Sequence, residues 1–97
     1  MIGPGQNGFH FTNAGILTSA PNKSGVYVIF NPQTWIYVGE SGDIQGRLIQ
    51  HLNGDNQRIT RCAPAGFQFE LFPAEQRVAR QNQLILQLDP VCNRRLG

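Results

Sequence analysis

The sequence predicts an α+β domain in which a small, mostly antiparallel three-stranded sheet is flanked by helices, in the order β-β-α-β-α. Three runs rich in β-branched and aromatic residues, at 25–30, 35–39 and 67–72, are typical of short strands. Two stretches, 44–53 and 74–88, carry apolar residues at helical spacing. The 97 residues amount to one domain, and a hydrophobic fraction of 40% is enough for one core.

The first two strands are expected to form a hairpin, because the link Asn31-Pro32-Gln33-Thr34 has turn chemistry. Each strand carries one tyrosine, Tyr27 in the first and Tyr37 in the second. A register in which paired residue numbers sum to an even number places both phenols on one face of the sheet, and a shift by one residue separates them. The sequence alone leaves the register open.

The first helix is expected to begin after Asp43, which suits the N-cap position, and to stop at Gly54. Ile44, Leu48 and Leu52 recur every four residues and form its expected buried stripe.

The second helix is expected to end at Asp89-Pro90, because a residue that precedes proline disfavours the helical conformation. Its inward side is expected to carry Val78, Ile85 and Leu88. Gln81 lies between them, so we expect a polar amide at the core or its rim, where it must find partners.

Three segments lack a strong helix or strand pattern. Residues 1–8 hold glycines and a proline and are expected to form a loose arm, whereas 9–12 alternate and offer a candidate edge strand. We therefore divide the chain into an N-terminal arm over 1–23 and a domain over 24–97. Residues 55–66 are polar and are expected to form a loop or a broken helix.

Charge and cysteine content restrict the function only weakly. The net charge of +2 does not require an acidic partner, although seven of the eight basic residues are arginine, which binds phosphate in a two-pronged geometry. Cys62 and Cys92 form no zinc motif or disulfide framework, so reduced thiols are expected and a bridge between them stays open. No apolar run approaches the ~20 residues of a membrane span and no signal peptide is evident, so we expect no membrane partner and a cytoplasmic location.

Polar residues on the helices break the apolar pattern. Arg47 and His51 are four residues apart on the first helix and share a face that borders its buried stripe. In isolation, such a pair is more often a surface arginine with an incidental histidine. Together with Tyr27, Tyr37 and the inward Gln81, it can converge on one surface, and such convergence is typical of a functional site.

Gly25-Val26-Tyr27 and Tyr37-Val38-Gly39 resemble the two half-motifs that give the GIY-YIG nuclease family its name. The resemblance extends over residues 24–93, with its pieces in order and at compatible spacing. The remaining pieces are Asp43, Arg47-Leu48, His51, Leu84-Ile85, Pro90 and Asn93.

The resemblance implies a compact α+β fold that cuts DNA phosphodiester bonds with one divalent metal ion, usually Mg²⁺, with Mn²⁺ as an alternative. It implies that Tyr27 helps to deprotonate or orient the attacking water, with Tyr37 beside it. Arg47 would neutralise charge that develops on the phosphate, and His51 would assist proton transfer or hold a tyrosine. Asn93 would brace the site or contact the DNA backbone. Phosphodiester hydrolysis needs such groups around a positioned water.

One position departs from the family pattern. The family places a glutamate, the only protein ligand of its metal, where this chain has Gln81. An amide oxygen is uncharged and Mg²⁺ prefers carboxylates, so metal binding and hydrolysis are expected to be weakened. Glu40 offers a second candidate carboxylate. Three explanations stay open: an engineered inactive variant, a natural protein that has lost catalysis and kept DNA binding, and weak cutting through another metal arrangement.

The interpretation is therefore a GIY-YIG-type DNA endonuclease domain impaired at Gln81. Arg58 and Arg61 are further candidates for substrate binding. The alternative is a non-catalytic nucleic-acid-binding module on the same fold, and the arginines available to bind phosphate are Arg47, Arg58, Arg61, Arg77, Arg80, Arg94 and Arg95. A protein-interaction domain that keeps only the fold is a third hypothesis, because a fold does not fix a function.

Overall fold

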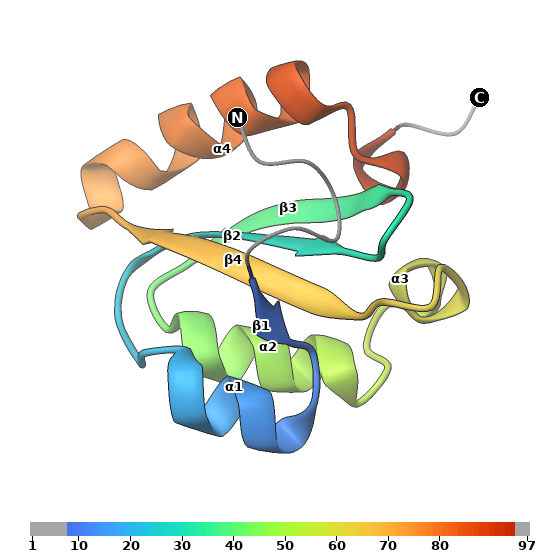
Figure 1. The fold of residues 1–97 in the computed structure, drawn as a ribbon. Helices are drawn as coiled ribbons and strands as arrows, with labels where there is room; N and C mark the ends of the chain where they lie inside the picture. The colour runs from blue at the N-terminus through green and yellow to red at the C-terminus, as the bar shows by residue number, and fades with distance from the viewer. Residues whose placement is uncertain (1–7, 95–97) are drawn as a thin grey trace.

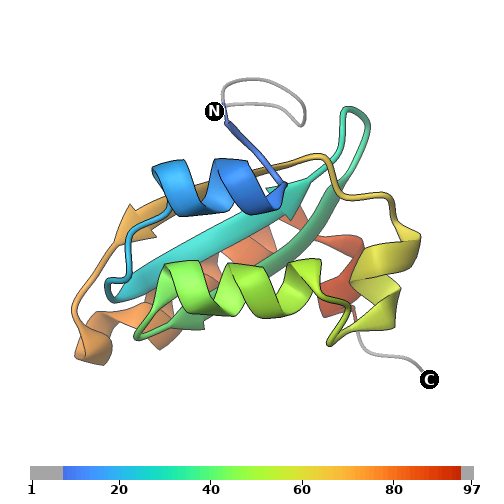
Figure 2. The ribbon, with the colours of Figure 1, turned by 90° about the horizontal axis from the view of Figure 1, so that it is seen from below.

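The structure, a computed structural model, describes residues 8–94. Four antiparallel strands form one sheet in the order β1-β4-β2-β3. Helix α4 covers one face of this sheet, and α1 and α2 lie side by side on the other (Figure 1; Figure 2). The elements are β1 (Phe9–His10), α1 (Asn13–Ser19), β2 (Gly25–Phe30), β3 (Trp35–Ser41), α2 (Ile44–Leu52), α3 (Gln57–Arg61), β4 (Gly66–Leu71), α4 (Ala74–Leu88) and the 3-10 helix η1 (Val91–Asn93).

The hairpin of β2 and β3 has the register that places both tyrosines on one face. Tyr27 lies opposite Gly39, and Tyr37 lies opposite Ile29. The two phenols are therefore diagonal neighbours rather than a directly opposed pair. Both rings contact His51 of α2, so they point to the side of the sheet that α2 covers, and their centroids lie 6.3 Å apart.

Helix α2 begins as expected, because the Asp43 carboxylate accepts a hydrogen bond of 3.0 Å from the Gly46 amide. The expected buried stripe is wrong at its C-terminal end. Ile44, Leu48 and His51 are the buried residues of this helix, whereas Leu52 is half-buried. The helix rotates a histidine into the interior because the spacing i, i+4, i+7 follows the helical period more closely than steps of four.

The N-terminal segment contributes more than a candidate edge strand. Strand β1 pairs with β4, so the sheet has four strands rather than the three expected from the sequence. Helix α1 follows, with the Thr12 hydroxyl accepting from the Gly15 amide at 3.0 Å and Ile16 fully buried. Phe11, Ile16 and Ala20 of this segment pack in the core, and residues 1–7 of the expected loose arm over 1–8 lie outside the described residues.

Helix α4 has the expected bounds, but its expected inward face is wrong at one residue. Val78 is 55% exposed, and Leu84 is the residue that α4 buries. Leu84 packs with Val38 of β3 in a second apolar cluster, on the opposite side of the sheet from the tyrosines. The inward face therefore includes Arg77, Gln81 and Leu84, which follow one another at helical spacing.

Two further features complete the fold. Within residues 55–66, the short helix α3 begins after Asn56, whose side chain accepts from the Arg58 amide, and it buries Ile59.

Cys62 and Cys92 are free thiols whose sulfur atoms lie 3.8 Å apart. None of the helices over residues 8–94 combines the length and apolarity needed to cross a bilayer.

Candidate functional site

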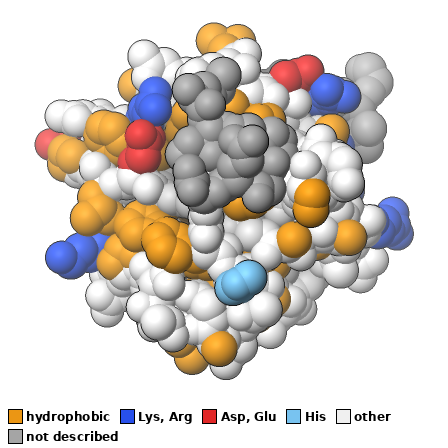
Figure 3. All heavy atoms as spheres, in the orientation of Figure 1, with side chains coloured by type: hydrophobic (Ala, Val, Ile, Leu, Met, Phe, Trp, Pro, Cys, Tyr) orange, Lys and Arg blue, Asp and Glu red, His pale blue; other side chains and the backbone are white. Residues whose placement is uncertain are grey.

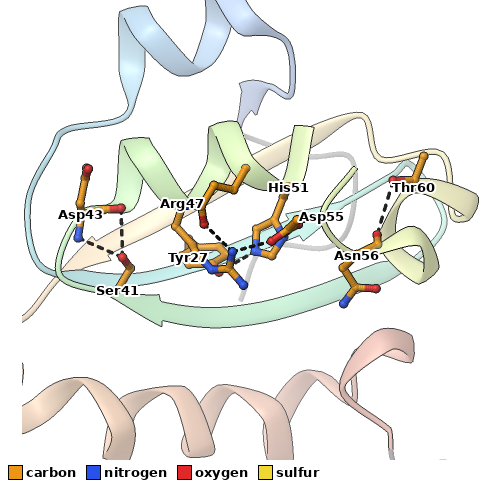
Figure 4. Close-up of polar contacts among 9 residues, drawn as sticks. Tyr27, Ser41, Asp43, Arg47, His51, Asp55, Asn56 and Thr60 are labelled. Atoms are coloured by element: carbon orange, nitrogen blue, oxygen red, sulfur yellow. Dashed lines mark hydrogen bonds and ion pairs between the residues drawn. The ribbon is translucent and has the colours of Figure 1, made fainter. Parts of the chain in front are cut away.

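Four of the predicted site residues gather on the α2 side of the hairpin. Tyr27 comes from β2, and Arg47 and His51 come from α2 (Figure 4). Tyr37 comes from β3. The His51 ring centroid lies 5.6 Å from that of Tyr27 and 5.3 Å from that of Tyr37. The sequence prediction that these groups converge is met for this set of four.

A chain of hydrogen bonds joins these groups. The Tyr27 hydroxyl lies 2.8 Å from Nε2 of His51, and Nδ1 of the same ring lies 3.0 Å from Oδ1 of Asp55. The other carboxylate oxygen of Asp55 accepts from Nη1 of Arg47 at 2.5 Å, and Gln50 accepts from that nitrogen at 2.6 Å. Tyrosine, imidazole, carboxylate and guanidinium thus form one continuous polar network.

Asp55 is the member that the sequence reasoning missed. It lies in the stretch expected to be a loop or broken helix, just after α2. Gly54 has a φ of +87°, a conformation that favours glycine, and it turns the chain so that Asp55 returns toward the last turn of the helix. A carboxylate four residues after His51 and directly after a helix-ending glycine is the sequence signal that could have identified it.

Gly39 explains why a tyrosine ring fits here at all. A Cβ atom at this position would collide with the Tyr27 hydroxyl and ring carbon Cζ, and would come within 2.9 Å of a Tyr37 ring carbon. Gly39 lies opposite Tyr27 in the hairpin, so the missing side chain is the space that the phenol occupies. The glycine of the second half-motif is therefore required by the tyrosine of the first.

Burial and charge set the protonation state of each group. Burial raises the pKa of Tyr27 well above its usual value, and burial likewise raises the pKa of Tyr37, although Arg47 opposes both. Burial lowers the pKa of His51, an effect that the Asp55 charge only partly offsets. Slight burial raises the pKa of Asp55, but the hydrogen bond and charge of Arg47 and the hydrogen bond from His51 together hold that pKa below its usual range. At neutral pH the phenols and the imidazole are neutral, and the carboxylate is ionised.

The site is closed at one end and open at the other. Tyr27 is 1% exposed and His51 2% exposed, so little of either residue reaches solvent. Tyr37 is half-buried, and the Arg47 side chain is 36% exposed. A ligand from solution therefore meets Arg47 and Tyr37 first.

The two candidate metal ligands are not among the hydrogen-bonded members of this network: Glu40 lies on β3, where its charge helps to raise the pKa of Tyr37, and Gln81 lies on α4. Arg77 and Leu84 both contact residues at β3, so Gln81, which lies between them on the same side of α4, faces this edge strand. Glu40 forms an ion pair with Arg77, with 2.8 Å between Oε2 and Nε. Arg77 also donates to the Ser24 hydroxyl at 3.0 Å.

Of the predicted substrate-binding residues, Asn93 lies in η1 and Arg58 contacts it. The Asn93 side chain donates to the Val38 carbonyl at 2.9 Å and accepts from the Val38 amide at 2.7 Å, so it braces β3. Arg58 donates to the Val91 carbonyl at 3.3 Å, and Arg61 is exposed on the same short helix, α3. On the face shown in Figure 3, Lys and Arg side chains appear at separate points rather than in one patch.

Two hairpin tyrosines and an arginine–histidine pair on the next helix thus lie together on one face of an antiparallel sheet flanked by helices, an α+β domain with one polar site. The family model described as the GIY-YIG catalytic domain matches residues 23–85, and the chain belongs to the GIY-YIG family. A search of curated proteins gave no match.

Solved structures of the GIY-YIG N-terminal endonuclease domain of UvrC from Thermotoga maritima are similar to this chain. A point mutant bound to its catalytic divalent cation is 25% identical, with a TM-score of 0.71 over 82% of this chain and 91% of that one. The same domain bound to magnesium is 21% identical, with a TM-score of 0.72 over 84% and 96%. These likenesses confirm the α+β fold with its antiparallel sheet.

The residues present do not fit a tightly held magnesium ion. No three His, Cys, Asp or Glu side chains within residues 8–94 are grouped so that they could share a metal. Glu40 and Asp55 are each engaged by an arginine, and Gln81 offers only an uncharged oxygen. A hard divalent cation prefers carboxylate oxygens, so this donor set is poorer than one with a free carboxylate at position 81.

Proposed function

We propose that this chain is a GIY-YIG-type DNA endonuclease domain whose hydrolytic activity is impaired as the sequence stands. The observation that carries the proposal is the continuous network from Tyr27 through His51 and Asp55 to Arg47. Phosphodiester hydrolysis needs a cation at the phosphate oxygens and a route for protons away from the attacking water. The similar UvrC domain, described as an endonuclease domain bound to a catalytic divalent cation, supports this assignment.

Arg47 supplies the cation. Its exposed guanidinium is the first charged group that a phosphate would meet, and its contact with Asp55 raises its pKa, so it stays protonated. Because Gln50 and Asp55 both hold Nη1, the guanidinium plane is oriented before a ligand arrives. A pre-oriented donor stabilises developing charge without first having to reorganise.

Tyr27 and His51 supply the proton route. As a water admitted with the substrate attacks the phosphorus atom, the bond to the leaving sugar oxygen breaks and that oxygen takes a proton from solvent. The proton of the attacking water passes to the Tyr27 oxygen while the phenol proton passes to Nε2 of His51, 2.8 Å away. Burial raises the pKa of Tyr27, which makes an isolated phenolate costly. The two proton transfers must therefore occur together. The Tyr37 ring contacts both Tyr27 and His51 and lies between them and the half-exposed part of the site.

Gln81 is the reason to expect impairment. The divalent cation, Mg²⁺ or Mn²⁺, would require an anionic ligand at this position, and the amide cannot provide it. We therefore expect the unaltered chain to bind these ions weakly.

Nicking of supercoiled plasmid DNA tests the proposal, with the unaltered chain and Gln81→Glu compared in Mg²⁺ and in Mn²⁺. Gln81→Glu is expected to nick at least about 10²-fold faster, because metal-assisted stabilisation is worth several kcal/mol. Calorimetric titration with Mn²⁺ should show tighter binding by this variant. Gln83→Glu, which adds the same charge at an exposed position of α4, is the matched control. Failure of Gln81→Glu to nick DNA with either metal would refute the endonuclease assignment.

A second candidate is a module that binds nucleic acid without cutting it. The pairing of Glu40 with Arg77 and of Asp55 with Arg47, together with the neutral Gln81, favours it. It predicts duplex DNA binding whose affinity falls steeply with salt, by about 0.9 log units per tenfold change in salt for each phosphate contact. Fluorescence anisotropy at several salt concentrations measures this slope, and salt-independent binding opposes both candidates.

A further inference from the structure

We propose that Asp55 is a positioning residue that fixes the direction of the hydrogen bond between Tyr27 and His51, a role that rests on the proposed function of the site. The residue touches neither a substrate nor the phenol. It acts through the imidazole, and its place just after α2 puts it on the far side of the ring from Tyr27 (Figure 4).

The direction follows from what each atom can donate. An ionised carboxylate only accepts hydrogen bonds, so the 3.0 Å contact with Asp55 requires a proton on Nδ1 of His51. A neutral imidazole carries one ring proton, which leaves Nε2 as a bare acceptor. The Tyr27 hydroxyl, 2.8 Å from Nε2, must then be the donor. Its proton already points along the path that it takes in the reaction.

No other acid facing the ring, within the described part of the chain, can impose this arrangement. The titratable and charged groups that face His51 are Tyr27 from β2, Tyr37 from β3, Arg47 from α2 and Asp55. Asp55 is the sole anion of this set. His51 is 2% exposed, so bulk water does not compete for Nδ1.

The same carboxylate also links the proton route to the cation. One oxygen of Asp55 holds His51 and the other holds Arg47. Without Asp55 the ring is free to carry its proton on Nε2, where it would donate to the Tyr27 oxygen and reverse the bond. Arg47 would at the same time lose one of the two groups that hold Nη1.

Nitrogen-15 NMR of the imidazoles tests the first part of the proposal in the free protein, independently of any cutting. His10 and His51 are the two histidines of the chain, and His10 is exposed, so it serves as an internal reference. The unaltered chain should show His51 protonated at Nδ1 at neutral pH. In Asp55→Ala the Nε2-protonated form should appear, and the pKa of His51 should fall, because the Asp55 charge raises it.

Asp89→Asn is the matched control. Asp89 also pairs with an arginine, Arg94, but it is exposed, and its left-handed backbone suits asparagine. Amide spectra establish that each variant is folded, and Asp55→Asn replaces Asp55→Ala if the alanine variant is not. An unchanged His51 tautomer and pKa in the folded Asp55 variant, or equal changes in Asp89→Asn, would overturn the proposal.

Nicking in the Gln81→Glu background tests the role in the reaction. Adding Asp55→Ala should slow nicking by roughly 10²-fold, the usual scale of general acid–base assistance, and shift the acidic limb of the pH profile to lower pH. Asp55→Glu should recover part of the rate. Unchanged nicking despite a changed tautomer would show that Asp55 does not act in the reaction. If Gln81→Glu itself fails to nick, the proposed function fails, and the NMR result still decides the arrangement of His51.

Discussion

Replacing Tyr27 with phenylalanine removes one oxygen atom and keeps the ring, so it isolates the buried hydrogen bond to His51. Both residues are almost fully buried, at 1% and 2% exposure, and water cannot easily replace the phenol. Nε2 of His51 would lose the partner that lies 2.8 Å away and would stay in an apolar setting. The variant should therefore be less stable, although it contains no cavity larger than the lost oxygen.

The expected loss can be placed on a scale. Leaving a buried hydrogen-bonding group unsatisfied costs about 1–3 kcal/mol. A domain of this size has a total stability of roughly 5–15 kcal/mol. Each kcal/mol shifts the melting temperature of such a domain by about 4–8 °C. Tyr27→Phe should lower Tm by roughly 4–24 °C.

Urea unfolding followed by circular dichroism at neutral pH measures the difference in unfolding free energy between Tyr27→Phe and the unaltered chain. Tyr37→Phe is the control, because it removes the same atom from a ring that is only half-buried. It should cost no more than about 0.5 kcal/mol. If the two variants lose equal stability, the buried bond between Tyr27 and His51 does not contribute in the way argued.

Three other predictions concern neighbouring features of the site. Gly39→Ala forces a Cβ against the Tyr27 ring and should lower the free energy of unfolding, measured by calorimetry, by about 1–3 kcal/mol. The control Gly42→Ala should lower it less, because its Cβ would meet only Nη1 of Arg77, at 3.3 Å. Equal losses in the two variants would contradict the steric argument. The unfolding free energy should decline as the pH drops below the ordinary histidine value of 6.5, because folded His51, with its lowered pKa, takes up a proton less readily than the unfolded chain. His51→Gln should flatten that decline in urea titrations at several pH values, and an unchanged slope would locate the effect elsewhere. Arg47→Ala should weaken DNA binding and reduce the salt dependence of the affinity by about one phosphate contact, as measured by fluorescence anisotropy. Arg61→Ala, at an exposed position, tests in the same assay whether α3 contacts DNA. An unaltered salt dependence in Arg47→Ala would show that Arg47 does not contact the DNA.

The elements with complete local signals were predicted well. Helix α4 has both its expected ends, because Pro73 precedes it and Asp89-Pro90 stops it. The hairpin followed from turn residues between two β-rich runs. Its register did not, since hydrophobic residues occupy both faces of a central strand and do not mark which face a tyrosine takes.

Helix α1 escaped prediction because its local signals are weak. It is only seven residues long and contains Gly15, and tertiary packing of Ile16 holds it in place. The inward face of α4 was misjudged for a related reason. Val78 is apolar but lies on the solvent side of the helix, while Arg77 turns inward because Glu40 and Ser24 accept hydrogen bonds from it.

For the site, the family motif predicted that Tyr27, Tyr37, Arg47 and His51 lie close together. The structure places these four residues in one cluster. Asp55 was missed because its role depends on a backbone turn at Gly54, not on helical spacing. The depth of His51 was also missed. A histidine beside an apolar stripe does not show by itself that a buried phenol and a carboxylate are available to satisfy both of its nitrogens.

The two hydrogen bonds between the Asn93 side chain and the Val38 backbone affect whether this domain can aggregate through the edge of its sheet. β3 is an outermost strand, and such a strand normally exposes a row of amides and carbonyls to which a foreign strand can add. Near the middle of this row, one amide and one carbonyl are already occupied by a side chain of the same molecule. At the opposite border, β1 is only two residues long and offers little to extend. The β3 margin is thus guarded near its middle against sideways growth into aggregates, and removing the Asn93 side chain would leave this margin open.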